Sequence, residues 1–194
     1  MYVFGNGESR TSVNIDKLNG TKFGCNAIMR DYTMDHLVCV DRRMVDEAVK
    51  SKVNEHTLIY TRDDWIERYK GVERVRTVPS LPYNGMTRPD QPFQWGSGPY
   101  ALLLAAMKAK GQTVSLIGFD LYSNTKNVNN MYKGTANYAK VESRNIDPRY
   151  WIHQISMVFK CFPKVNFTIY QTHNWELPNN WIQPNISLDN INKL

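Results

Sequence analysis

The sequence predicts an α/β protein with a Rossmann-like, mostly parallel sheet that has helices on both faces. Short apolar runs alternate with helical segments along the 194-residue chain, as expected where helices join parallel strands. Glycine-containing turns follow several of these runs, and in such sheets the strand ends form the ligand-binding edge. The length and a hydrophobic content of 42% suit one domain with a buried core. We expect this domain to span residues 1–173 and a polar C-terminal tail to span residues 174–194.

The first half of the chain contains five strand-like runs and two helix starts. The runs are short and apolar, or alternate apolar with polar residues, and cover residues 3–4, 22–28, 36–41, 57–60 and 72–78. Asp41 closes the third run and is suited to cap a helix over residues 42–52, whose apolar residues share one face. Thr61 and Asp64 have the Thr-x-x-Asp spacing of a second helix start.

The second half contains the most regular helix and the clearest central strand. Pro99 fits the first position of a helix that Gly111 ends, and apolar residues recur within it at helical spacing. Residues 114–120 are typical of a central strand, and residues 165–170 form the final predicted strand. Asp147-Pro148 opens the last helix with an N-cap residue and a proline at the first helical position.

Two long segments, residues 79–95 and 123–138, lack periodicity and are rich in Asn, Gly and other turn residues. Loops of this length in compact domains are usually functional or mobile. No internal repeat or linker divides the chain, which favours a single domain.

Charge and cysteine content restrict the partners and the compartment. The net charge of +6 favours an anionic partner, but the basic residues are scattered in pairs, which makes nucleic acid an unlikely ligand. The sequence contains no run of 18 apolar residues, so no transmembrane segment is predicted. The first residues do not have the pattern of a signal peptide. The three cysteines have neither CxxC nor zinc-site spacing. We expect a cytoplasmic protein. The sequence is also compatible with a homo-oligomer.

Two glycine turns are candidates for binding a nucleotide. Gly5-Asn6-Gly7-Glu8-Ser9 follows the first strand, where Gly5 and Gly7 let the backbone approach a ligand and Asn6 and Ser9 add donors. Gly96-Ser97-Gly98-Pro99 opens the best helix, whose free amides and dipole favour an anion. Either turn could also be a tight connection without a ligand. The first turn lacks the third glycine of the dinucleotide fingerprint, which argues against NAD.

Further candidates lie at the ends of later strands. Asp120 and Tyr122 end the strand over residues 114–120, and His173 follows the last predicted strand, so all three could reach the ligand edge. The sequence has no Walker A motif, no Gly-x-Ser-x-Gly and no Asp-x-Asp pair for a metal and a nucleotide sugar. We therefore expect no bound metal and no separate cofactor.

Four segments, taken in order, carry a resemblance to a known family. They are Gly5-Asn6-Gly7-Glu8-Ser9, Phe23-Gly24-Cys25-Asn26, Ser97-Gly98-Pro99-Tyr100 and Leu116-Ile117-Gly118-Phe119-Asp120-Leu121-Tyr122. These resemble the Gly-Asn-Gly-Pro-Ser turn, the Cys-Asn strand end, the Ser-Gly-Val-Tyr helix start and the Ser-Gly-Ile-Asp-Phe-Tyr strand of the bacterial sialyltransferases that modify lipooligosaccharide. A looser likeness extends to other Rossmann-like proteins, including motility-associated glycosyltransferases and pterin pyrophosphokinases.

The resemblance implies a modified Rossmann sheet, a CMP-sugar donor as co-substrate and no metal. By this resemblance the residues in contact with the nucleotide or its phosphate are Asn6, Ser9, Asn26, Ser97 and Gly98. Tyr122 and Tyr132 would stabilise the departing phosphate.

The chain departs from the family at the general base. The family has a histidine in a His-Ser-Lys-Asn stretch, whereas the matching stretch here is Glu142-Ser143-Arg144-Asn145. A carboxylate can deprotonate an acceptor hydroxyl, so Glu142 is the candidate base and His173 the alternative. The replacement is equally compatible with lost or changed transferase activity.

Three functions remain open from the sequence. The first is a metal-independent glycosyltransferase that uses a nucleotide sugar and a glycan acceptor. The second is a Mg²⁺-dependent pyrophosphokinase with Asp41 and Asp120 as candidate carboxylates. The third is a non-catalytic nucleotide-binding or virus-associated accessory protein on the same fold.

Overall fold

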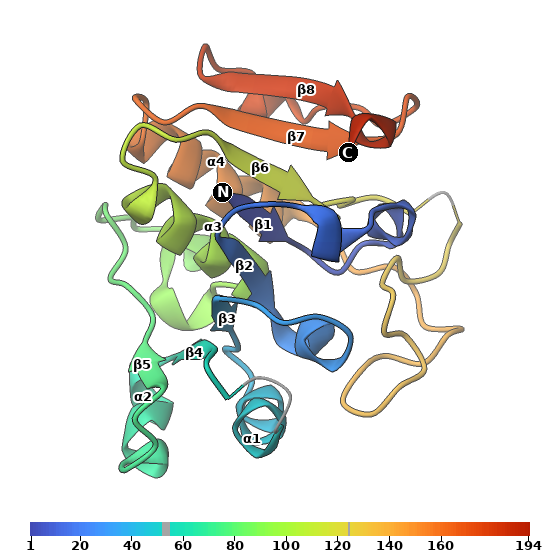
Figure 1. The fold of residues 1–194 in the computed structure, drawn as a ribbon. Helices are drawn as coiled ribbons and strands as arrows, with labels where there is room; N and C mark the ends of the chain where they lie inside the picture. The colour runs from blue at the N-terminus through green and yellow to red at the C-terminus, as the bar shows by residue number, and fades with distance from the viewer. Residues whose placement is uncertain (52–54, 124) are drawn as a thin grey trace.

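The computed structural model describes residues 1–51, 55–123 and 125–194. Its strands form one eight-stranded, all-parallel sheet in the order β5-β4-β3-β2-β1-β6-β7-β8 (Figure 1). The strands are β1 Tyr2–Phe4, β2 Lys22–Cys25, β3 His36–Val38, β4 Leu58–Thr61, β5 Val75–Thr77, β6 Val114–Ile117, β7 Phe167–Gln171 and β8 Ile186–Asn190. The predicted α/β, Rossmann-like fold is confirmed.

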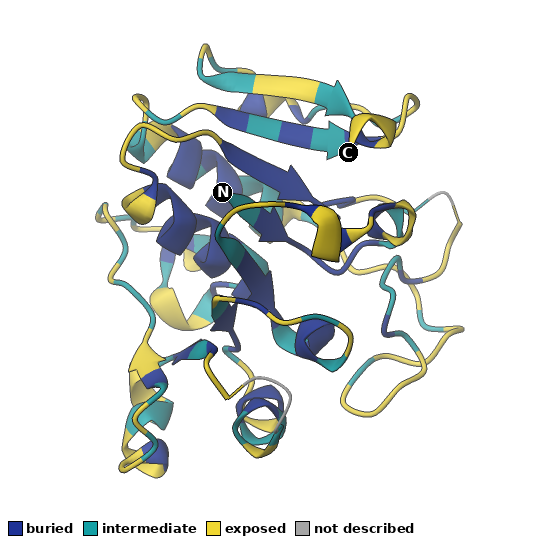
Figure 2. Cartoon of the chain, viewed as in Figure 1, coloured by how far each residue is buried: buried dark blue, intermediate teal, exposed yellow. Residues whose placement is uncertain are grey.

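Helices and short 3₁₀ turns cover both faces of the sheet. The α-helices are α1 Arg42–Lys50, α2 Asp63–Ile66, α3 Ser97–Lys108 and α4 Arg149–Cys161. Successive strand residues point to opposite faces: Val3 belongs to the core shared with α3 and α4, and Phe4 to the core shared with α1. Figure 2 shows the central strands and α3 as the buried centre of the molecule, whereas the edge strands β5 and β8 are partly exposed.

Helix α3 carries apolar residues almost all round, because it lies between the sheet and α4. Its residues from Pro99 to Ala106 are all buried, as expected of a helix inside a core rather than at its surface. This fixes the helix start, Gly96-Ser97-Gly98, at the edge of the sheet where the strands end.

The strand order places a ligand crevice beside β1. The chain moves from β1 outward to β5 and then returns through α3 to β6, which pairs with the other side of β1. The connections after β1 and β6 therefore leave in opposite directions, and open α/β sheets bind ligands at such a point.

The structure differs from the sequence prediction in residues 174–194. This segment supplies β8, which pairs with β7, and it places Trp181 in the core with no exposed surface. Two predicted strands also end early, since Asn26 (φ 51°) and Gly118 (φ 74°) turn the chain after Cys25 and Ile117. Residue 52 of the predicted helix and residue 124 of the predicted loop lie outside the described residues.

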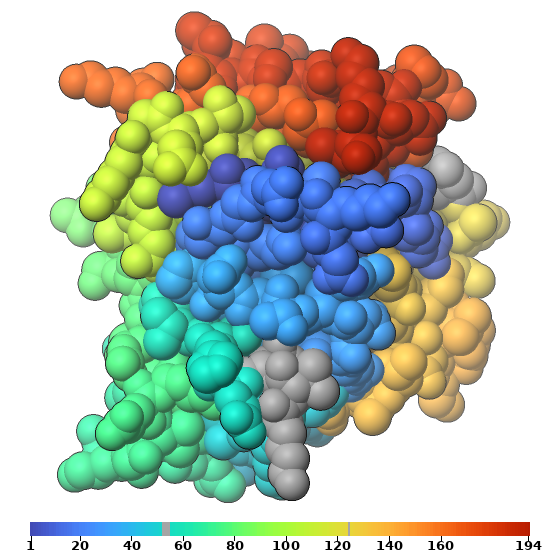
Figure 3. Space-filling model, in the orientation of Figure 1, coloured from blue at the N-terminus to red at the C-terminus, as the bar shows by residue number. Residues whose placement is uncertain are grey.

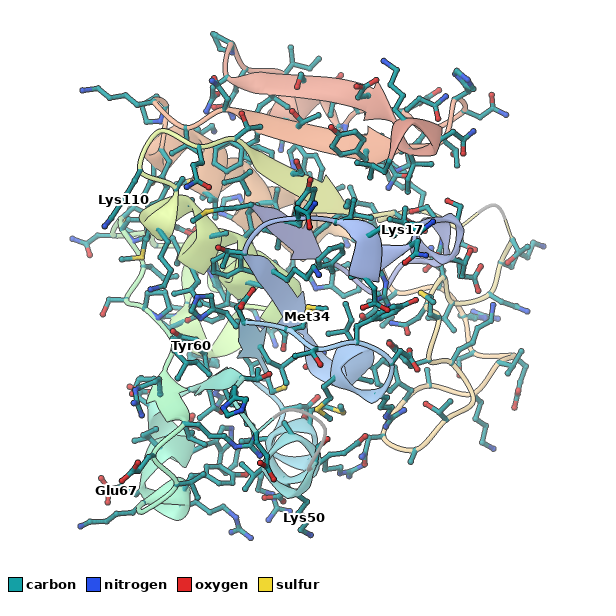
Figure 4. All side chains as sticks on the ribbon, in the orientation of Figure 1. Lys17, Met34, Lys50, Tyr60, Glu67 and Lys110 are labelled. Carbon is teal, nitrogen blue, oxygen red and sulfur yellow. The ribbon has the colours of Figure 1, made fainter. Side chains whose placement is uncertain are left out.

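Many charged side chains lie at the periphery of the molecule. Lys50, Glu67 and Lys110 are exposed and extend away from the ribbon, whereas Met34 and Tyr60 lie between packed elements (Figure 4). In the parts of the chain that the structure describes, no helix combines the length and apolar character needed to cross a membrane.

A buried carboxylate fastens the loop of residues 79–95 to α4. Asp90 accepts hydrogen bonds from Tyr83 Oη (3.0 Å) and Thr87 N (3.0 Å) and contacts His153 Nε2 at 2.6 Å. Burial alone would raise the pKa of Asp90, but the hydrogen bonds from Thr87, His153 and Tyr83 bring it well below its usual value. The ionised form is therefore the one that the fold stabilises.

We expect Asp90→Asn to destabilise the fold by about 1–3 kcal/mol at neutral pH, because buried donors lose a charged acceptor. Since the folded pKa is lowered, the contribution of Asp90 is present above the unfolded pKa of about 3.9 and declines as the pH falls toward the folded value. Urea unfolding of both proteins at several pH values measures this. A difference that stays constant down to acid pH would contradict the assignment.

Candidate functional site

A cleft of about 280 Å³ lies at the carboxyl edge of the central strands. Its walls come from the turns after β1, β2, β3 and β6, the start of α3, the side of α4 and two loop segments. The lining residues that the sequence singled out for binding a nucleotide are Gly5, Asn6, Gly7, Asn26, Ser97, Gly98 and Asp120. Figure 3 shows the loop after β6, in gold, packed beside the blue N-terminal segment at this edge.

The first glycine turn fastens β1 to β6. Gly5 N donates to Ile117 O (2.8 Å) and Gly7 N donates to Gly118 O (2.9 Å). These two amides are therefore taken by the sheet and do not serve as the free ligand donors that the sequence suggested. The glycines are needed for close approach instead: a Cβ on Gly5 would lie 2.3 Å from the carbonyl oxygen of Gly118.

Asn6 lines the cleft and carries a buried polar atom that lacks a partner in the described parts of the chain. Its Nδ2 donates to Cys25 O (3.1 Å) and to Tyr138 Oη (3.2 Å), whereas its Oδ1 is buried without a hydrogen-bond partner among the described residues. A buried acceptor without a partner is rare in folded proteins.

The start of α3 offers the cleft two backbone donors. The amides in a first helical turn have no partner within the helix and form its positive end. The Ser97 hydroxyl fixes this turn, because it donates to Asn26 Oδ1 (2.9 Å) and accepts from Val40 N (3.0 Å). The ends of β2 and β3 thus hold the first turn of α3, whose residues Ser97 and Gly98 line the cleft.

Asp120 is a structural carboxylate that separates the cleft from a second cavity. It accepts hydrogen bonds from Ser9 N (2.9 Å), from the Ser9 hydroxyl and from Gln171 Nε2 (3.1 Å). Ser9 consequently lines the second cavity rather than the cleft. With its oxygens occupied, Asp120 is poorly placed to hold a metal ion or to take a proton.

Buried groups beneath the cleft add a positive charge. Arg10 is 1% exposed, forms no ion pair among the described residues and lies over the rings of Tyr32 and Tyr132. Two of its three guanidinium nitrogens lack partners there. Burial raises the pKa of Cys25 in the cleft wall to about 12, with the Arg10 charge opposing it, so this thiol is neutral and no nucleophile.

The four predicted catalytic side chains do not gather in the cleft. Tyr132 is buried behind it, where its hydroxyl donates to Asp31 Oδ2 (2.6 Å) and burial raises its pKa. Glu142 is exposed outside the cleft, and His173 contacts Asn190 Nδ2 at the β7–β8 edge. Tyr122 lines the second cavity. None of the four side chains lines the cleft, so their positions do not favour catalytic roles there.

The structure adds cleft residues that the sequence did not assign to a nucleotide. They are chiefly Asp41, Phe119, Asn129, Asn130, Asn145, Ile146 and Trp151. Backbone bonds from Val128 N to Ser143 O (2.9 Å) and from Asn145 N to Lys126 O (3.0 Å) join the two loops that carry several of them. The run of Asn in a loop directly after a central strand was the available sequence signal.

No group of three or more His, Cys, Asp or Glu side chains that could hold a metal ion is found among the described residues. The fold and the cleft define a parallel α/β protein with a cleft at its strand-order reversal. No protein-family model, curated protein or solved structure gave a significant match to the chain.

Proposed function

We propose that the cleft binds a nucleoside monophosphate unit and that the protein is a metal-independent glycosyltransferase using a CMP-sugar-like donor. The observation that carries the proposal is the start of α3, where two backbone donors at the positive end of a twelve-residue helix line the cleft beside the unpaired Asn6 Oδ1. Helix starts of this kind bind phosphate groups.

The charges around the cleft support one phosphate rather than a polyphosphate. Asp41 and Asp120 are the charged side chains among the described lining residues, and no Lys or Arg lines the cleft. The balancing charge comes from the α3 dipole and from Arg10 below. A triphosphate would need several cations or a metal ion, so these features favour the transferase over the pyrophosphokinase alternative.

The remaining walls suit a nucleoside. Phe119, Ile146 and Trp151 supply apolar surface for a base. The carboxylate of Asp41 has no hydrogen-bond partner among the described residues and can accept from ribose hydroxyls. The cleft volume of about 280 Å³ lies just below the roughly 300 Å³ at which small-molecule sites start. This favours a mononucleotide over a dinucleotide.

In the proposed reaction, an acceptor hydroxyl oxygen attacks the anomeric carbon as the bond from that carbon to the phosphate oxygen breaks. The nucleoside monophosphate leaves with the bonding electrons, and the hydroxyl proton passes to a base. The α3 amides would stabilise the charge on the departing phosphate.

The test compares two substitutions of Gly98, at the start of α3, that differ only in charge. A Cβ on Gly98 would make only an ordinary contact, 3.4 Å from Phe119, so Gly98→Asp and its neutral isostere Gly98→Asn should both fold. We expect CMP to raise the melting temperature of the wild type without Mg²⁺. Gly98→Asp should weaken CMP binding by more than about tenfold relative to Gly98→Asn, because two negative charges would meet.

Equal CMP binding by the two variants would refute the placement of the phosphate. A rise in melting temperature obtained only with ATP and Mg²⁺ would favour phosphoryl transfer instead. Release of CMP from a CMP-sugar, followed by chromatography, then tests the chemistry.

A non-catalytic nucleotide-binding protein is the second candidate. The position of Glu142 outside the cleft favours it, because this residue matches the base of the resembled family. Tight CMP binding without turnover of any CMP-sugar would support this candidate.

A further inference from the structure

A second cavity of about 400 Å³ adjoins the cleft at the ends of β6 and β7. Asp120 and Asn129 line both spaces and form the wall between them. Tyr122 and Trp175 supply its aromatic surface, and we call it the aromatic cavity.

Hydrogen bonds fix the ring of Trp175 and the backbone of Tyr122 in the aromatic cavity. Trp175 Nε1 donates to Asp120 O (2.6 Å), and Asn129 Nδ2 donates to Tyr122 O (2.9 Å). The ring centroids lie 6.3 Å apart at an interplanar angle of 41°, and Tyr122 is 39% exposed. A fixed, partly exposed aromatic surface of this kind suits a ligand with one apolar face and a polar edge.

The rim of the aromatic cavity is polar but not basic. Amide and hydroxyl side chains, including Gln171, Thr172 and Asn174, alternate around it. Although the chain carries a net charge of +6, no Lys or Arg is found among the described residues that line this cavity. Glu176 forms no ion pair or hydrogen bond among the described residues. Such a rim disfavours phosphates and carboxylates and offers many acceptors to hydroxyl groups.

We propose that the aromatic cavity binds a neutral sugar, with the C–H face of the pyranose ring on Tyr122 and Trp175 and a sugar hydroxyl donating to Glu176. That this sugar is the acceptor rests on the proposed transferase function, and the shared wall at Asp120 and Asn129 supports it. Glu176 is then a carboxylate in position to receive the proton of the attacking hydroxyl.

The experiment uses the full chain and the methyl glycosides of glucose, galactose, mannose and N-acetylglucosamine. Saturation-transfer NMR is recorded at millimolar sugar, with and without CMP, on the wild type, Tyr122→Ala and Glu176→Gln. Tyr150→Ala is the matched control, because Tyr150 is 36% exposed and lines neither cavity. Both test residues are at the surface of the cavity, so their loss should leave the fold intact.

We expect ring C–H protons of at least one glycoside to receive saturation from the wild type and from Tyr150→Ala. Tyr122→Ala should weaken the binding of that glycoside by about tenfold or more, and Glu176→Gln should weaken its binding to a smaller degree. Binding of no glycoside, or glycoside binding unchanged in Tyr122→Ala, would overturn the proposal. Sugar binding by a protein whose melting temperature CMP does not raise would retain this site and refute the nucleotide proposal, so the two failures are distinguishable.

Discussion

Replacing Trp181 with alanine is expected to destabilise the protein by about 3–5 kcal/mol, the range for removal of a large aromatic side chain from a core. Trp181 has no exposed surface, its Nε1 donates to Ile152 O (2.9 Å), and its ring meets Phe159 edge-on with centroids 5.5 Å apart. Through these contacts the segment of residues 174–194 fastens α4 to the sheet. Chemical denaturation followed by circular dichroism gives the free energy of unfolding.

Ile182→Ala is the control for Trp181→Ala. Ile182 is the next residue and is 67% exposed, so its truncation should change the stability by no more than about 0.5 kcal/mol. If the two variants were equally stable, residues 174–194 would be an appendage, as the sequence had suggested, rather than part of the core.

Gly5→Ala is the second variant with a large expected effect. Its Cβ would lie 2.3 Å from Gly118 O and 2.9 Å from Gly118 C, and both are backbone atoms of the adjoining strand connection. Gly118 cannot easily yield, because its own φ of 74° favours glycine. The central pairing of β1 with β6 must therefore open, at an expected loss of about 3 kcal/mol or more.

Gly98→Ala tests whether the effect of Gly5→Ala is specific. Both glycines line the cleft, but the Cβ at Gly98 has ordinary contacts, and Ala is the better helix former. Thermal melting should show a strongly lowered midpoint for Gly5→Ala and an unchanged or raised one for Gly98→Ala. A normal midpoint for Gly5→Ala would mean that β1 and β6 are less closely apposed than described.

The sequence predicted the fold because its central strands are short apolar runs that end in glycine turns. Residues 3–4 and 114–117 show this pattern, and both form strands at the centre of the sheet. The edge strand β8 escaped prediction, since Ile-Ser-Leu-Asp-Asn is polar and half-exposed. Only its pairing with β7 makes it a strand, and sequence pattern does not contain that tertiary contact.

The candidate site was predictable where residues directly follow strands or open a helix. Asn6, Asn26 and Gly98 reach the cleft because backbone topology alone brings them there. Glu142 and Tyr132 lie in long connections, whose course depends on side-chain packing far along the chain. Tyr132 turns inward to Asp31 and Arg10, and no local pattern announces that contact.

The position of β1 has a consequence for how the chain acquires its shape. This strand pairs with β2 through Tyr2 and Lys22, but its other neighbour, β6, meets it through Tyr2 and Ser115. Closing so long a loop is entropically unfavourable, and proteins dominated by such distant pairings fold slowly. The cleft walls come from both sides of this distant pairing, so we expect the cleft to form only once β1 and β6 have paired.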